Sequence, residues 1–128
     1  MVDRSFVVKA DQNMFLSIMH NLLMNAIKFT PSNGSILIKA DVEEQPSGTF
    51  SVRVSVTDTG VGISEEDQAK LFSLTRPFTL PGTEKETGTG LGLLLTREMV
   101  EKHGGSLRIE SVIGQGSTFS FPLPLFVP

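Results

Sequence analysis

The sequence of 128 residues contains no cysteine, which excludes a disulfide framework and any zinc site built on thiolates. No apolar run approaches the roughly 18 residues of a membrane-spanning helix, and the first residues lack the apolar core of a secretory signal. The net charge of −3 argues against the broad basic surface of a nucleic-acid-binding domain. We therefore expect a cytoplasmic domain that contacts neither nucleic acid nor membrane, whether or not a longer protein carrying it is membrane-anchored.

The hydrophobic pattern predicts helices and strands that form one α+β domain with two layers. In the segment 36–42 apolar and polar residues alternate, which is typical of a strand with one buried face. Asp11 is a suitable N-cap for the first helix, and Ser64 for the second. The helices are expected over 12–29, from Ser64 onward and over 91–103, and the strands over 5–10, 36–42, 50–57, 106–111 and 117–123.

Three polar residues of the first predicted helix, Asn21, Asn25 and Lys28, lie on one stripe beside its apolar face. An amide oxygen can coordinate a hard cation, and an ammonium group can contact phosphate. A solvated polar face explains the same residues, so both interpretations remain open at this point.

A carboxylate follows the predicted strand over 50–57, in the sequence Asp58-Thr-Gly60-Val-Gly62. A carboxylate at a strand end can accept hydrogen bonds from the N–H groups of a ligand, and glycines allow a flat ring to approach the backbone. A tight turn is the alternative interpretation, because this short pattern is common.

Alternate glycines at Gly88, Gly90 and Gly92 precede the third predicted helix, whose first N–H groups suit phosphate. The pattern matches neither GxGxxG after a strand nor GxxxxGK[ST], so neither familiar phosphate loop is present. The long segment before these glycines is typical of a lid. Its two cations, Arg76 and Lys85, either reach phosphate or are ordinary solvated charges.

Four segments, taken in their order along the chain, resemble the catalytic and ATP-binding domain of sensor histidine kinases. They are HNLLMNAIKFTP, DTGVGIS, GTGLGLLLTREMVEKHGGSLRIES and GQGSTFSFPLP. The resemblance covers residues 1–128 and implies the Bergerat ATP-binding fold, a two-layer α/β sandwich with a mixed sheet of about five strands and three helices on one face. The family's two phenylalanines three residues apart are replaced by Phe72 and Phe78. The helices that carry the phospho-accepting histidine are missing, so we expect a domain excised from a longer chain.

The resemblance implies a role for each residue that matches a family motif. Asn25 would coordinate a Mg²⁺ ion that bridges the phosphates of ATP, and Asp58 would accept a hydrogen bond from the adenine amino group. Asn21, Lys28 and Arg76 would act in phosphoryl transfer, and Lys28 would also contact phosphate. The further ATP-binding residues that the resemblance implies are Gly60, Gly62, Ile63, Leu71, Lys85, Gly88, Thr89, Gly90, Leu91, Gly92 and Thr118.

The implied activity is transfer of the γ-phosphoryl group of ATP to a histidine on the protein's own dimerisation domain, with a response-regulator receiver domain as a further partner. In the superfamily's ATPases a glutamate stands where this chain has Asn21, and an amide cannot act as a general base near neutral pH. This difference favours a kinase over an ATPase. The alternatives are a serine kinase of the anti-sigma type, an ATPase clamp and a non-catalytic interaction module.

Three further residues are interpreted from their positions in the sequence. His20 and His103 do not suit a phospho-acceptor, and structural roles are expected for both. A helical wheel places Leu94 among the polar residues of the third helix. It is therefore expected to be either an ordinary exposed leucine or a contact for the missing helices or a receiver domain.

Overall fold

The computed structural model describes residues 8–70 and 91–125. In this part of the chain, no helix is both long enough and apolar enough to cross a membrane. Apart from the strand predicted over 5–10, the predicted helices and strands occur at the expected places, and their ends differ from the prediction by at most two residues. The elements are α1 (Gln12–Phe29), β1 (Ile36–Glu44), β2 (Phe50–Asp58), α2 (Glu65–Lys70), α3 (Leu91–Lys102), β3 (Arg108–Val112) and β4 (Gly116–Pro124).

Helix α1 begins and ends where the sequence predicts. The Asp11 side chain accepts a hydrogen bond from the Met14 N–H group at 2.9 Å, which satisfies one of the unpaired donors of the first turn. At the other end the Thr30 hydroxyl donates to the Ala26 carbonyl at 2.6 Å, just before Pro31. The apolar residues that α1 buries lie between Ile18 and Phe29, whereas Leu16, Met24 and Ile27 are exposed.

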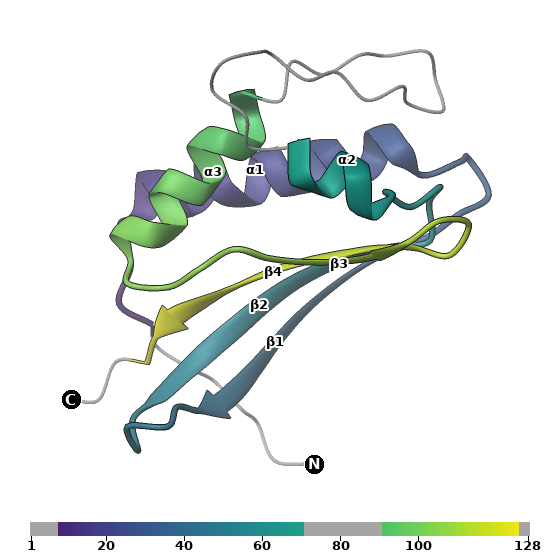
Figure 1. The fold of residues 1–128 in the computed structure, drawn as a ribbon. Helices are drawn as coiled ribbons and strands as arrows, with labels where there is room; N and C mark the ends of the chain where they lie inside the picture. The colour runs from purple at the N-terminus through teal and green to yellow at the C-terminus, as the bar shows by residue number, and fades with distance from the viewer. Residues whose placement is uncertain (1–7, 71–90, 126–128) are drawn as a thin grey trace.

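The four strands form one sheet in the order β1-β2-β4-β3, and the helices lie on one side of it (Figure 1). This arrangement confirms the predicted α+β fold of two layers. The strand expected over 5–10 is represented among the described residues by a single bridge from Val8 to Leu125. The expected mixed pairing is not observed in the described part of the chain, where all neighbouring strands are antiparallel. Strands β1 and β2 form one hairpin, β3 and β4 form another, and the two hairpins meet through the antiparallel pair of β2 and β4.

The core lies between α1, α3 and the two central strands. Val54 of β2 stands opposite Phe121 of β4, and Phe121 is fully buried. The ring of Phe15 in α1 meets the Phe121 ring in a tilted arrangement, with centroids 6.3 Å apart. The side chains that α1 buries are Ile18, Leu22, Ala26 and Phe29.

The edge strand β1 departs from the expectation of a buried apolar face. Ile38 is 50% exposed and Val42 is 41% exposed, although they stand opposite the buried residues Val56 and Val52. Helix α1 packs on β2, and its coverage does not reach these side chains at the edge of the sheet. Alternation therefore identified the strand and its face correctly, but not the depth of burial.

Leu94 was expected on the polar side of α3, and this expectation is wrong. Leu94 is buried, whereas its neighbour Leu95 is 54% exposed. A helical wheel shows direction only, and Leu94 lies one to two turns before Glu98 and Glu101, which have similar directions. Side chains of similar direction therefore meet different surroundings at different heights along the helix.

A matched pair of substitutions on the helix-covered face of the sheet tests this difference in burial. Val56→Ala, at a site that is 1% exposed, should cost about 2 to 3 kcal/mol of unfolding free energy. Val42→Ala removes the same atoms from the edge and should cost less than about 1 kcal/mol. Urea unfolding of both variants measures the two values, and equal losses would contradict the described coverage.

Candidate functional site

Asp58 is the last residue of β2 and is only 4% exposed, on the face of the sheet that the helices cover. Its Oδ1 atom accepts a hydrogen bond from the Gly60 N–H group at 2.9 Å. Burial raises the pKa of the Asp58 carboxyl above its usual value of 3.8, against the opposing effect of the backbone N–H groups of Gly60 and Ser117. A buried carboxylate at this position has acceptor capacity for a ligand that brings an N–H donor.

The turn after Asp58 is held closely on two sides by backbone. A Cβ atom at Gly60 would overlap the Phe29 carbonyl at the end of α1, and the Val61 N–H group donates to that same carbonyl at 3.1 Å. Gly62 has a φ of 76°, and a Cβ there would overlap the Val112 carbonyl of β3. Both glycines are thus required by the packing of the chain itself, before any ligand is considered.

A group of serines beneath this turn was not identified from the sequence. The Ser111 hydroxyl donates to the Gly116 carbonyl at 3.0 Å and accepts from the Ile63 N–H group at 2.7 Å. Its oxygen is also 2.7 Å from that of Ser117. Because the single proton of Ser111 is engaged with Gly116, the Ser117 hydroxyl is the donor in that contact. These bonds tie the β3–β4 hairpin to the segment that follows Asp58.

Thr118 lies on the opposite face of β4 from the Asp58 side chain. Its hydroxyl is 3.0 Å from that of Thr57, whereas the register places Ser117 opposite Asp58. The structure thus brings Ser117, and not Thr118, to the carboxylate. The alternation of side chains along this strand, taken with a partner register, is the signal that could have identified Ser117.

The polar stripe of α1 is present as expected, with Asn21, Asn25 and Lys28 each half-buried. The Asn21 Nδ2 atom donates to the Thr96 hydroxyl of α3 at 3.0 Å, and Thr96 is fully buried. The Lys28 ammonium lies 5.2 Å from the centroid of the Phe29 ring. Asn21 thus braces α1 against α3, and Thr96 is a further residue that was not identified from the sequence.

Asn25 would offer a metal ion one neutral oxygen. Among residues 8–70 and 91–125 there is no cluster of three His, Cys, Asp or Glu side chains that could hold a metal. This donor set fits Mg²⁺ only when phosphate oxygens and waters complete its coordination.

The remaining predicted residues fall into two groups. Ile63 is buried in the core, and Leu91 and Gly92 are the first residues of α3. The predicted site residues that lie outside the described residues are Leu71, Arg76, Lys85, Gly88, Thr89 and Gly90, together with Phe72 and Phe78.

His103 has the structural role that was expected. Its Nε2 atom accepts a hydrogen bond from the Asp11 N–H group at 3.0 Å, so the ring proton is on Nδ1, which donates to the Met99 carbonyl at 2.8 Å. The imidazole thereby joins the C-terminal end of α3 to the N-cap of α1. His20 lies exposed on α1, in a groove that Leu95 and Glu98 of α3 also line.

Residues 10–126 match the family described as histidine kinase-, DNA gyrase B- and HSP90-like ATPases. The chain belongs to this family. It is 42% identical over 118 residues to the non-motile and phage-resistance protein of Caulobacter vibrioides, and 36% identical over 122 residues to the sensor histidine kinase WalK of Bacillus subtilis. These alignments cover 92% and 95% of the chain but only 14% and 20% of the two relatives.

A solved structure agrees with these relationships. ShkA, whose full-length crystal structure is in complex with AMPPNP, has a TM-score of 0.73 and 30% sequence identity to this chain, and the alignment covers 97% of the chain and 24% of ShkA. The resemblance to the ATP-binding domain of sensor histidine kinases is therefore confirmed.

The raised pKa of Asp58 predicts a pH dependence of stability. Because the folded state holds the Asp58 proton more tightly than the unfolded state, this group stabilises the fold fully below pH 3.8 and loses that contribution as the pH rises through its folded pKa. Asp58→Asn keeps an acceptor for Gly60 but removes the titration. Its unfolding free energy, relative to that of the wild type, should therefore increase with pH across this window. Urea unfolding over a pH series measures this difference, and a constant or opposite trend would contradict the assignment.

Proposed function

We propose that this chain binds Mg-ATP and donates its γ-phosphoryl group to a histidine on a separate dimerisation domain, in two-component signal transduction. Family membership and the kinase relatives support an ATP-binding domain of this type. The chain spans only 14% and 20% of the two relatives, and in this proposal the phospho-accepting histidine and the receiver domain are supplied by other domains.

The observation that carries the proposal is the buried carboxylate of Asp58. A carboxylate with this little solvent is costly unless hydrogen-bond donors surround it. The N–H groups of Gly60 and Ser117 supply part of this set. An adenine amino group would supply a further donor. A bound nucleotide would thereby offset part of the cost of burying the Asp58 carboxylate.

The phosphate end of the nucleotide is assigned to the polar stripe of α1 and the start of α3. Asn25 would contribute an amide oxygen to Mg²⁺, and Lys28 would place a positive charge near the phosphates. The first N–H groups of α3, at Leu91 and Gly92, would face the phosphates. When bound, Mg²⁺ would neutralise phosphate charge, while Arg76 and Lys85 are proposed to contribute further cations.

The chemistry of Asn21 favours transfer to histidine over hydrolysis. Its amide cannot accept a proton from water near neutral pH, and its Nδ2 atom is engaged with Thr96. A neutral histidine attacks with its own lone pair and requires no general base at this position. The site is therefore suited to position a nucleophile that another domain delivers.

Replacement of Asn25 tests nucleotide binding. Asn25→Ala should weaken the affinity for a fluorescent ATP analogue by roughly tenfold or more in the presence of Mg²⁺, because charged phosphate would lose a metal-mediated contact. Asn13→Ala, at an exposed position of the same helix, should leave the affinity unchanged. Equal affinities of all three proteins would contradict the assignment of Asn25. Absence of binding to the wild type would favour a non-catalytic interaction module.

Replacement of Asn21 tests the choice between kinase and ATPase. Asn21→Glu places a potential general base one helical turn before Asn25 and should raise ATP hydrolysis without abolishing nucleotide binding. Asn21→Gln retains an amide and serves as the control, with no increase expected. Hydrolysis is measured as phosphate release, and transfer is measured with radiolabelled ATP and a histidine-containing dimerisation domain. An unchanged hydrolysis rate in Asn21→Glu would leave the argument about the base unsupported.

A further inference from the structure

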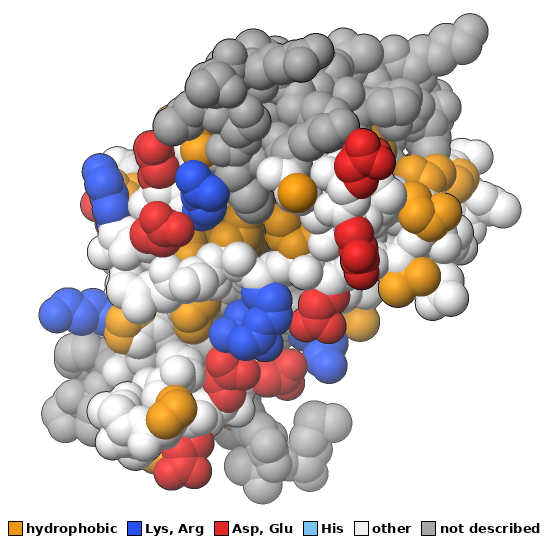
Figure 2. All heavy atoms as spheres, viewed as in Figure 1, with side chains coloured by type: hydrophobic (Ala, Val, Ile, Leu, Met, Phe, Trp, Pro, Cys, Tyr) orange, Lys and Arg blue, Asp and Glu red, His pale blue; other side chains and the backbone are white. Residues whose placement is uncertain are grey.

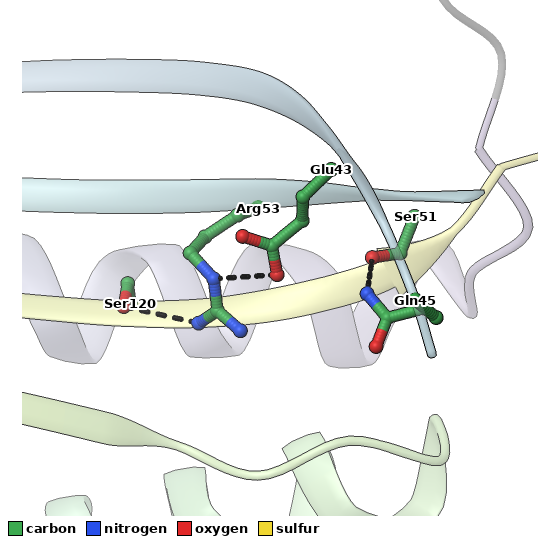
Figure 3. A network of polar contacts seen from close by, with 5 residues as sticks. All are labelled: Glu43, Gln45, Ser51, Arg53 and Ser120. Carbon is green, nitrogen blue, oxygen red and sulfur yellow. Dashed lines mark hydrogen bonds and ion pairs between the residues drawn. The ribbon is translucent and has the colours of Figure 1, made fainter. Parts of the chain in front are cut away.

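Strand β1 forms one edge of the four-stranded sheet and is held in a regular conformation. The Arg53 guanidinium of β2 donates to the Glu43 carboxylate of β1 at 2.9 Å and to the Ser120 hydroxyl of β4 at 3.1 Å. Figure 3 shows this bridge across three strands, with the Gln45–Ser51 contact of 2.6 Å beside it. These contacts hold the edge in place before any partner arrives, so a partner strand would not have to order it.

The backbone groups of β1 alternate between β2 and the outside of the sheet. The Gln45 N–H group donates to the Thr49 carbonyl at 2.7 Å, and the Ser35 carbonyl accepts from the Thr59 N–H group at 3.1 Å. Odd-numbered residues of the strand therefore direct their N–H and C=O groups toward β2. The even-numbered residues of 36–44 direct theirs outward, where a further strand can pair with them.

The side chains of the same even-numbered residues lie on the helix-covered face of the sheet. Ile38 and Val42 are half-exposed there, and Phe50 at the start of β2 is also 50% exposed. On the other face, Lys39 and Asp41 are 3.7 Å apart and exposed. An edge strand that combines outward backbone groups with apolar side chains is a template for strand pairing.

We propose that two copies of this chain associate through β1, with the two strands antiparallel about a two-fold axis at Ala40. Ala40 directs its backbone groups outward, so it forms a hydrogen-bonded pair with the partner's Ala40. Ile38 then stands opposite the partner's Val42, and Lys39 stands opposite the partner's Asp41. The symmetry makes the Ile38–Val42 contact and the Lys39–Asp41 contact each occur twice. The charged pairs fall at non-hydrogen-bonded positions, where opposed side chains are closest.

The charges of β1 select this register over its neighbours. An axis at Val42 would place Asp41 opposite the partner's Glu43, and an axis at Lys39 would place two lysines opposite each other. An axis at Ile38 would leave part of the strand unpaired. With the axis at Ala40 all nine residues of Ile36–Glu44 are paired, and no like charges are opposed.

In the proposed dimer the partner strand is added to the outer edge of β1. Asp58 lies one strand inward on β2, opposite Ile36, and Asn21 of the polar stripe contacts Thr96 of α3. A single pair of strands buries less area than a standard stable interface, so association should depend on concentration. This proposal does not depend on the proposed kinase activity.

A charge-swap series tests the proposal. Sedimentation velocity of the 128-residue chain should show a concentration-dependent dimer. Lys39→Asp opposes two pairs of aspartates and should weaken the dimer by roughly tenfold or more. Lys39→Asp combined with Asp41→Lys restores opposite charges and should restore the dimer. Arg108→Asp makes the same change of charge on β3 and should have no effect.

Hydrogen exchange identifies the interface. In concentrated samples the amides of Ile38, Ala40 and Val42 should become protected, and dilution should remove this protection. A monomer at every concentration would overturn the proposal, as would a dimer that Lys39→Asp does not weaken or the double swap does not rescue. If a histidine-containing dimerisation domain protects these amides without self-association of the chain, the edge belongs to that partner and the proposal fails.

Discussion

The arrangement of the candidate site depends on one close approach between backbone segments, that of the Phe29 carbonyl to the turn after Asp58. Val61 donates to this carbonyl at 3.1 Å, and only a glycine at position 60 allows the approach. On its other side the same turn meets the turn between β3 and β4, where the Gly114 N–H group donates to the Val61 carbonyl at 2.8 Å. The end of α1, the end of β2 and the β3–β4 hairpin are thereby fixed relative to one another.

This constraint relates the positions of candidate residues that are far apart in the chain. Asn25 and Lys28 belong to the last two turns of α1, so anchoring Phe29 at the turn brings them to the side of the sheet where Asp58 ends its strand. The bond from Asn21 to Thr96 then sets the position of α3 against α1. Because Ser111 and Ser117 support the turn from below, a substitution there is expected to act on Asp58 through its position rather than through contact with a ligand.

The single layer of helices covers the central strands of the sheet more completely than the edge strand β1. The helices protect the central strands and leave the apolar side chains of β1 half-exposed. On the face shown in Figure 2, acidic and basic side chains are interspersed. The edge of β1 differs from this mixed surface, because its side chains and backbone groups are complementary to a second copy of themselves.

The sequence alone determined most of the elements, because capping residues, glycines and periodicity act over short distances, and it supplied most of the candidate residues as predictions. Asp11, Pro31 and the alternation along 50–57 sufficed to place α1 and β2, and the four motifs in order sufficed for the family. Tertiary structure decided the rest. The exposure of Ile38, the burial of Leu94 and the choice of Ser117 rather than Thr118 all depend on which element lies above a residue or opposite it. Those relations arise from packing and strand register between distant segments, and a local pattern carries no information about them.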